Sequence, residues 1–365
     1  MEIYDITESE SQRIQILKLW FSIMVIFIHS YSEGVNLIGG NIAYDVPVWL
    51  EWTKYMISQS VSRCAIPAFF FLSAILLYRK DFTWSDNIKK KIKTLFIPYV
   101  ILNTFWICFY FTAQHIGPVS IYFSNPDNII SEWNWIDFIN AYLGFIPKID
   151  ALSYYPILYP LWFMRDLMFL NIVALQLKKI IDMFPRFIFA LLIVMLLFNI
   201  QFHIFCLSQS SLVYFCFGYY FVKLGFHLSD TDKLNPMITF CLYIIIVLLD
   251  CLTRNMPWHY LMRTISIIMG IIFFYRFTTN IVDSAFKKRA LWLSGFSFSI
   301  YLFHEMSLTI TKKLLAKLLP TGPVFQVLLY FGIPVIIFIY CIVLSNILNK
   351  CVPKLYCILV GGRNK

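Results

Sequence analysis

Two ionisable side chains lie within one apolar segment of the chain, residues 14–31 with the sequence IQILKLWFSIMVIFIHSY. Lys18 is near one end of this segment and His29 is near the other. Ionisable groups inside a membrane span are costly and by default indicate a functional site. At the rise of an α-helix, the axis between the two residues covers roughly 16 Å. The spacing predicts a cation at one membrane face and, toward the other, an imidazole that can act as a base or a nucleophile.

Other apolar segments also carry ionisable side chains near one end. They are Arg63, Arg165, Asp166, His304 and Glu305. Charged groups at membrane depth should face one another or a water-filled cavity. Arg165 and Asp166 are adjacent, so they point about 100° apart on a helix and need not pair with each other. We expect Asp166 to neutralise a nearby arginine, chiefly as a structural ion pair. Glu305 either orients an imidazole or contacts lipid headgroups, and both roles stay open.

The composition places the chain in a membrane. Of its 365 residues, 59% are hydrophobic and 14% are charged, whereas soluble domains average about 25% charged residues. The net charge of +10 is better explained by basic cytoplasmic loops than by binding to nucleic acid. The N-terminus lacks the basic region and cleavage site of a signal peptide, so we expect the first span to be retained. The nine cysteines have no paired spacing, and we expect neither disulfides nor a metal site.

A transmembrane helix needs about 20 apolar residues. The sequence therefore predicts an all-α integral membrane protein, a polytopic bundle of about ten transmembrane helices in a single domain over residues 1–365. Segment 131–144 is expected to form an interfacial helix between two of these spans. The expected spans lie near residues 14–31, 61–78, 95–115, 158–177, 187–206, 210–226, 236–252, 260–279, 291–311 and 323–349.

Basic residues predict the orientation of these spans. Segment 79–93 contains six lysines and arginines against two aspartates, and we expect it on the cytoplasmic side. If the spans alternate, the other strongly basic connections and the N-terminus lie on that side as well. This orientation does not use the candidate site residues, yet it places His29 and the later clusters toward the outer face. Lys312, Lys313 and Lys317 also fall outside, against the usual bias.

A basic rim is expected at the inner membrane surface. Basic residues there either anchor a protein to anionic lipids or bind the phosphates of a ligand, and the residues alone leave this choice open. The rim consists of Arg13, Lys18, Lys89, Lys90 and Lys93.

The sequence contains no G-x-S-x-G, P-loop, H-E-x-x-H or G-x-G-x-x-G motif. Four other histidines near expected span ends have no partner in sequence, and we interpret His115, His203, His227 and His259 as structural.

Five short motifs occur in order along nearly the whole chain. The first is the pair Lys18 and His29; the others are SRCAIPAFFFLSA, KKKIKTLFIPY, LWFMRDL and FSFSIYLFH. Each motif alone is weak, but in this order and spacing the sequence resembles the membrane-bound acyltransferase family 3. These integral membrane O-acyltransferases modify surface polysaccharides. The chain has Lys18 where that family more often has arginine, and Ala74 where glycine is usual.

The resemblance implies transfer of an acyl group, most often acetyl, from cytoplasmic acyl-CoA to a hydroxyl of a polysaccharide or of its lipid-linked precursor. Acetyl-CoA would be a co-substrate, and no metal is expected. The expected location is the inner membrane, with the lipid bilayer, the donor and the glycan as partners and no nucleic acid. Homo-oligomerisation stays open.

The same resemblance implies roles for individual residues. The donor phosphates would bind at the basic rim, and His29 would be a general base or a nucleophile. Arg63 would stabilise an oxyanion or orient the acceptor. His304 and Glu305 would orient His29 or bind sugar, and Asp166 would be an electrostatic partner. The residues expected to contact substrate are Trp162, Arg165 and Tyr301.

Two other classes of function stay open at this point. The chain could be an exporter of glycans or lipids, with buried charges along its path, although it lacks the half-to-half similarity of many transporters. It could also be a non-catalytic membrane subunit of a polysaccharide assembly complex. Unmodified glycan, rather than mislocalised glycan, would distinguish loss of an acyltransferase from loss of an exporter.

Overall fold

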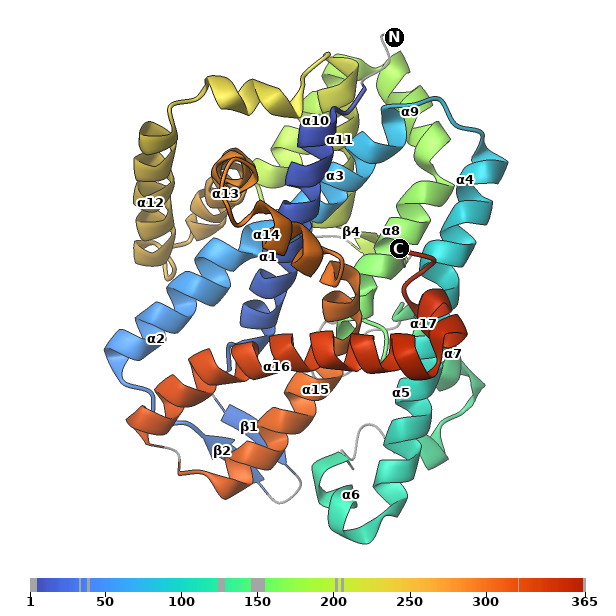
Figure 1. Ribbon diagram of the computed structural model, residues 1–365, viewed down its shortest axis with the longest axis vertical. Coiled ribbons are helices and arrows are strands. Elements are labelled where there is room, and N and C mark those ends of the chain that lie inside the picture. Colours follow the sequence, from blue (N-terminus) through green and yellow to red (C-terminus); the bar gives the residue numbers. More distant parts are fainter. Residues whose placement is uncertain are drawn as a thin grey trace.

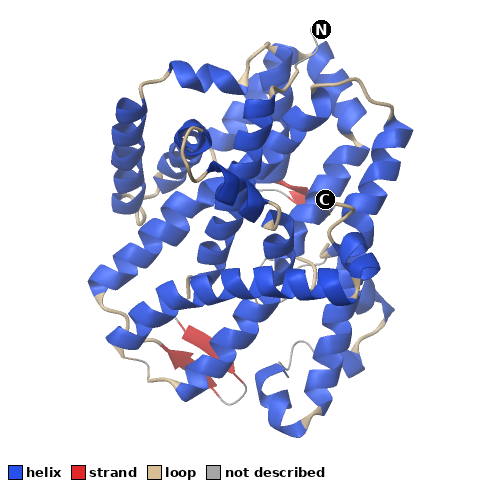
Figure 2. Cartoon of the chain, viewed as in Figure 1, coloured by secondary structure: helices blue, strands red, loops and turns tan. Residues whose placement is uncertain are grey.

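The computed structural model is almost entirely helical (Figures 1 and 2). It describes residues 5–32, 34–37, 40–123, 129–145, 155–200, 203–204, 207–320 and 322–363. Two short antiparallel hairpins accompany the helices: β1 (Gly34–Leu37) pairs with β2 (Gly40–Ala43), and β3 (His203–Ile204) pairs with β4 (Leu207–Ser208). The predicted all-α membrane class is therefore confirmed, with these hairpins as additions.

Helix α1 (Glu8–Ser30) forms the centre of the bundle (Figure 1). Thr7 and Glu10 form a capping box at its start, which satisfies backbone N–H groups that would otherwise lack partners. Its side chains Ile16, Phe21 and Ile26 are completely buried. Because α1 packs against helices from the early, middle and late parts of the chain, it fixes the position of whatever its own residues carry.

Among the residues that the structure describes, five helical segments are long and apolar enough to cross a membrane. The predicted count of about ten spans is not confirmed, because one bent pair of helices, Ala174–Met183 and Pro185–Leu197, adds at most a sixth. The segments that start at Val48 and Trp84 begin well before the predicted starts at residues 61 and 95, because turns with charged or polar residues continue each helix. The five segments are Glu8–Ser30, Val48–Tyr78, Trp84–His115, His259–Val282 and Pro323–Cys351.

The second and third of these segments each contain a π-helical stretch. The second consists of α2 (Val48–Lys54), η1 (Tyr55–Val61), η2 (Ser62–Cys64) and α3 (Ala65–Tyr78). The third consists of α4 (Trp84–Lys91), η3 (Ile92–Phe96) and α5 (Ile97–His115). Single π-helical turns inside helices are frequent at functional sites, and η1 directly precedes Arg63.

Several other predicted spans are broken or short. Segment 158–177 divides at Val173, whose backbone leaves helical geometry, and Pro185 then starts a helix bent by 111° from the one before. Proline lacks an N–H to continue the hydrogen-bond ladder, which explains this break. The remaining apolar helices of this region have 15 and 17 residues. The elements are α8 (Trp162–Ile172), α9 (Ala174–Met183), α10 (Pro185–Leu197), α11 (Gln209–Lys223) and α12 (Pro236–Leu252).

The C-terminal part supplies the helices that pack around α1. Helix α15 is long enough to span a membrane but carries several charged residues. Helix α7, from an earlier part of the chain, lies within the predicted interfacial segment, and its Trp135 is 71% exposed. The bounds are α6 (Gly117–Phe123), η5 (Ile130–Glu132), α7 (Trp135–Leu143), η6 (Tyr159–Leu161), η7 (Leu228–Lys233), α13 (His259–Val282), α14 (Lys287–Ser294), α15 (Ser297–Leu318), α16 (Pro323–Cys351) and α17 (Pro353–Leu359).

Helices α3 and α11 make an unusually close contact. A Cβ atom added to Gly218 of α11 would lie 2.4 Å from the backbone oxygen of Phe71 and 2.6 Å from the Cβ atom of Ala74. Small residues are common where membrane helices approach closely. Little more than a methyl group therefore fits at position 74, which explains why a small residue occurs there.

Candidate active site

The end of α1 brings His29 next to Glu305 of α15. His29 Nδ1 lies 3.3 Å from Glu305 Oε2, and the side chains are 13% and 18% exposed. Glu305 Oε1 accepts a hydrogen bond of 2.8 Å from the Thr309 hydroxyl, whereas Oε2 is buried and accepts none from the described residues. An imidazolium at His29 would therefore find an available carboxylate oxygen beside it.

His304 also lies beside His29. The two imidazole centroids are 5.3 Å apart, and His304 is completely buried. Its Nδ1 lies 2.8 Å from the Tyr301 carbonyl and 3.1 Å from the Ile300 carbonyl. Because a carbonyl only accepts, Nδ1 carries the proton and Nε2 carries the lone pair. Nε2 is buried and has no partner among the described residues, so it is available to accept a hydrogen bond.

The side chain of Lys312 contacts the C-terminal end of α1. Its Nζ donates to the backbone oxygen of His29, where the helix dipole favours a cation. Lys313 donates to the Tyr122 carbonyl over 2.5 Å and lies 5.1 Å from the Phe123 ring. These contacts give a structural reason for two of the three lysines that depart from the charge bias. The side chain of Lys317 lies outside the described residues.

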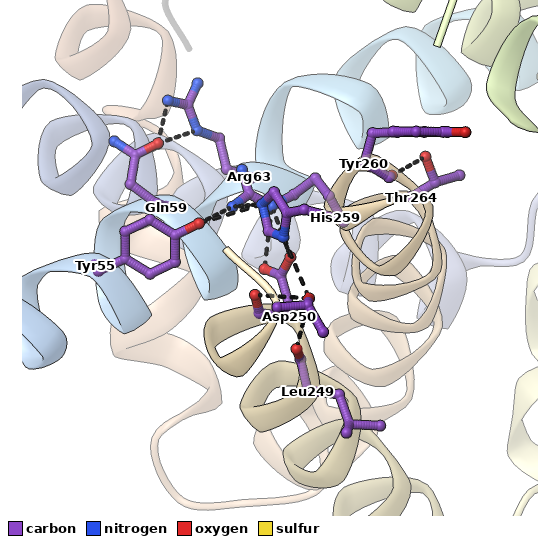
Figure 3. Close-up of polar contacts among 10 residues, drawn as sticks. Tyr55, Gln59, Arg63, Leu249, Asp250, His259, Tyr260 and Thr264 are labelled. Atoms are coloured by element: carbon purple, nitrogen blue, oxygen red, sulfur yellow. Dashed lines mark hydrogen bonds and ion pairs between the residues drawn. The ribbon is translucent and has the colours of Figure 1, made fainter. Parts of the chain in front are cut away.

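Arg63 borders the same region from the second long helix. Its Nε donates to Gln59 Oε1 over 2.8 Å, and Figure 3 shows its guanidinium turned toward Gln59. Its charge also interacts with His29 and with Tyr159. The Tyr159 ring stands edge-on to the His29 ring at 5.5 Å. In the described part of the chain no carboxylate forms an ion pair with Arg63, so its positive charge is available to a ligand.

Arg165 and Asp166 pair with each other. Arg165 Nη2 lies 2.9 Å from Asp166 Oδ1, and the pair is almost completely buried. Asp166 Oδ2 accepts from the backbone N–H and hydroxyl of Ser208, both at 3.0 Å. Arg165 Nη1 donates to the Leu143 carbonyl over 2.7 Å. The pair therefore joins α8 to the end of α7 and the start of α11, and both Asp166 oxygens are used there.

Tyr301 and Trp162, two aromatic residues predicted to contact substrate, pack among other aromatic side chains. The Tyr301 hydroxyl donates to the Pro160 carbonyl over 2.7 Å, and its ring centroid is 6.3 Å from that of His304. The Trp162 ring lies 6.1 Å from Phe70 and 6.2 Å from Tyr155. Both residues pack where η6 and α8 meet the second long helix and α15.

The residues expected at the inner rim separate into two groups. Arg13 is 2% exposed, pairs with Asp232 at 2.8 Å and donates to Thr278 and Tyr275. Its guanidinium is thus committed to α13 and η7. The other group contains the partly buried Lys18 together with the exposed Lys89, Lys90 and Lys93.

Three side chains could bring metal-ligating atoms together. One atom each of His29, His304 and Glu305 lies within 4.8 Å of the others, and zinc accepts nitrogen and carboxylate ligands. Lys312 contacts the backbone of His29, and the charge of Arg63 acts on its side chain. Because three side chains that could hold an ion do not by themselves indicate one, we assign no metal to this cluster.

A second polar cluster was not anticipated from the sequence (Figure 3). Asp250 of α12 is completely buried, and Arg263 Nε donates to both of its oxygens over 3.1 Å. Arg263 Nη2 also donates to the Tyr55 hydroxyl over 2.9 Å. His259 lies within the same network, 3.2 Å from the Tyr55 hydroxyl.

Sequence signals for these missed residues exist but are weak. Asp250 is an isolated acid in an apolar segment, and His259 and Arg263 are four residues apart, on one helical face. Lys312 follows Glu305 by two helical turns and so shares its face. None of these spacings identifies the partner helix, which only the fold supplies.

Comparisons with known proteins identify the family of the chain. A family model described as an acyltransferase domain matches residues 11–345. The chain belongs to this acyltransferase family. It is therefore an O-acyltransferase by class, as the resemblance predicted. The chain is also 24% identical over 363 residues to "Succinoglycan biosynthesis protein ExoH" of Rhizobium meliloti, covering 97% of this chain and 92% of that protein. No solved structure matches the chain significantly.

Proposed function

We propose that the protein transfers an acyl group, most often acetyl, from acyl-CoA to a hydroxyl of a surface polysaccharide or of its lipid-linked precursor. The family supports acyl transfer. The name of the similar Rhizobium protein, which refers to succinoglycan biosynthesis, supports a glycan acceptor. The donor binds at the inner face and the acceptor at the outer face.

The observation that carries the proposal is the contact between His29 and Glu305. His29 Nδ1 lies 3.3 Å from Glu305 Oε2, so a carboxylate fixes the orientation of the imidazole and stabilises its protonated form. Nε2 is then directed to substrate. A base held by a carboxylate is the arrangement that activates a hydroxyl nucleophile in acyl transfer.

We propose a general-base reaction at this site. His29 Nε2 takes the proton of the acceptor hydroxyl while its oxygen attacks the thioester carbonyl carbon. The tetrahedral intermediate then collapses, the carbon–sulfur bond breaks, and the imidazolium returns the proton to the departing thiolate. The products are an ester of the glycan and free CoA. Arg63 is the candidate to stabilise the oxyanion, because no carboxylate among the described residues neutralises it.

The other predicted residues support this site. His304 Nε2 is a buried acceptor for a sugar hydroxyl, and the Tyr301 ring lies beside it. Trp162 is the other aromatic residue that we propose to contact substrate. The Arg165–Asp166 pair holds α8 in place, so we propose a positioning role for it through the contacts with Ser208 and Leu143.

The length of α1 relates the two substrates. Lys18 and His29 belong to this one helix, and roughly 16 Å of helix axis separates them. Donor phosphates near Lys18 would leave the pantetheine arm to run along α1 toward His29. This separation gives a reason for two ionisable residues in the central helix.

The experiment that tests the function is the acyl content of the surface glycan in cells with and without the gene. We expect deletion to remove the ester groups while the amount of glycan at the surface stays the same. Glycan that accumulates inside with normal acylation would instead support an exporter and overturn the proposal.

A further inference from the structure

The C-terminal segment folds back onto two other parts of the chain. The Tyr356 hydroxyl of α17 lies 2.9 Å from the Ser299 hydroxyl of α15. Gly361 follows with a positive φ of 63°, and a Cβ atom there would lie 2.6 Å from the Thr94 carbonyl oxygen. Only glycine satisfies both constraints, so the path that delivers the next side chain, Arg363, is defined by the fold.

Arg363 lies where η3 and α15 begin. Its Nη1 donates to the Thr94 carbonyl over 3.1 Å, and its Cζ stands 3.9 Å from the centroid of the Phe298 ring. These partners are neutral. They fix the plane of the guanidinium and leave its Nη2 without a hydrogen bond in the described part of the chain.

Two lysines lie close to this guanidinium. The Ser22 hydroxyl, one turn after Lys18, donates to the backbone oxygens of Lys18 and of Ser297, the residue before Phe298. Lys91 lies one turn before Thr94. These contacts bring α1, α4 and the C-terminal segment to one place, and the positive charges of all three residues repel one another.

Like charges that converge without an acid are unfavourable unless an anion joins them. None of the carboxylates that the structure describes forms an ion pair with Lys18, Lys91 or Arg363. A phosphate monoester carries a charge of about −1.5 to −2 at neutral pH and three acceptor oxygens. Arginine suits such a group through two parallel N–H donors, and lysine through a point charge.

We propose that Lys18, Lys91 and Arg363 together bind the phosphate monoester of the acyl donor, which in CoA is the 3′-phosphate. The proposal rests on the proposed function for its choice of donor. It differs from the expected rim in two residues, because Lys91 and Arg363 replace Arg13, whose guanidinium is committed to Asp232. Lys18 belongs to the helix that leads to His29, so this phosphate would anchor the donor at the start of its path.

The test compares CoA with 3′-dephospho-CoA, using purified full-length protein in phosphatidylcholine nanodiscs and calorimetric binding. We expect wild-type protein to bind CoA at least about tenfold more tightly, as charge-assisted contacts to phosphate imply. Arg363→Gln and Lys91→Gln should weaken CoA about tenfold and change 3′-dephospho-CoA less than about twofold. Lys354→Gln is the matched control, an exposed lysine on α17, and should leave both affinities unchanged.

Three outcomes would overturn the inference. Equal weakening of both ligands would indicate a structural role for Arg363, and unchanged binding of CoA would show that it contacts no phosphate. An effect of Arg363→Gln on retention of phosphatidylglycerol, without loss of discrimination between the two nucleotides, would assign the site to a lipid headgroup. If the wild-type protein bound neither nucleotide, the donor in the proposed function would itself be wrong.

Discussion

At the scale of single residues, the site combines one imidazole with two different neighbours. Glu305 offers a carboxylate oxygen that is buried and accepts no hydrogen bond from the described residues, and His304 offers a second imidazole whose proton is held by backbone carbonyls. The carboxylate can stabilise an imidazolium at His29, and the lone pair on His304 Nε2 can accept a hydrogen bond from a hydroxyl. This asymmetry is the physical basis for treating His29 as the base.

Glu305→Gln tests that asymmetry. The amide keeps the shape but cannot stabilise an imidazolium, so we expect kcat to fall about 100-fold, within the range of general-base catalysis. The KM for acetyl-CoA should stay within about twofold, because Glu305 is proposed to act on the base and not on the donor. Steady-state transfer of labelled acetyl groups by purified protein measures both constants.

Thr309→Val is the companion variant. It removes the hydrogen bond to the other oxygen, Oε1, and should lower kcat much less than Glu305→Gln does. Wild-type kcat in Glu305→Gln would contradict the role of the carboxylate.

At the scale of elements, the long helices are held together by polar groups as well as by apolar packing. The buried Asp250 joins α12 to α13 through Arg263, and Arg263 reaches Tyr55 in η1. Glu51 of α2 pairs with Arg254 at 2.7 Å. The connection between α12 and α13 is thus fixed to the N-terminal half of the helix that carries Arg63.

Breaking the Asp250–Arg263 pair on one side should destabilise the protein. Asp250→Ala leaves Arg263 without its carboxylate, and loss of one partner of a buried pair costs up to about 3–5 kcal/mol. Thermal unfolding in detergent should show a clear decrease, whereas Asp283→Asn, at an exposed position, should not. The double variant Asp250→Ala with Arg263→Gln should recover part of the loss. A double variant that is less stable than either single change would contradict the pairing.

Sequence patterns predicted part of this organisation for identifiable reasons. The pair Lys18 and His29 was visible because charges inside an apolar segment are rare, and the structure brings His29 into contact with Glu305. The count of about ten spans is not confirmed, because apolar runs in the sequence do not reveal the breaks at Val173 and Pro185. The Asp250 network was missed because its members come from helices whose packing no local spacing encodes.

At the scale of the whole molecule, α1 connects the two ends of the proposed reaction. It packs against α13, α15, α16 and the helix that begins at Val48. Lys18, near the middle of α1, belongs to the proposed phosphate site, and the last turn of α1 lies beside Glu305. A donor on one side and an acceptor on the other would then meet at the end of one helix.

This arrangement makes a prediction about orientation. Single cysteines at Lys89 and Trp135, both exposed, should differ in their reaction with a membrane-impermeant maleimide. In a background whose other cysteines are replaced, position 135 should react in intact spheroplasts and position 89 only after permeabilisation. The basic residues of α4 are expected to face the cytoplasm. Labelling of position 89 in intact spheroplasts would contradict the orientation, and with it the direction of transfer.

The most direct measurement for the central claim is acetyl transfer by a His29→Ala variant that is expressed and folded like the wild type. Membranes that contain the variant should transfer labelled acetyl from acetyl-CoA to glycan at least about 100-fold more slowly, as loss of a general base requires. His115→Ala is the matched control, because His115 is exposed and its Nδ1 contacts the Phe111 carbonyl of its own helix. That control should retain wild-type transfer, and unaltered transfer in His29→Ala would show that His29 is not the catalytic base.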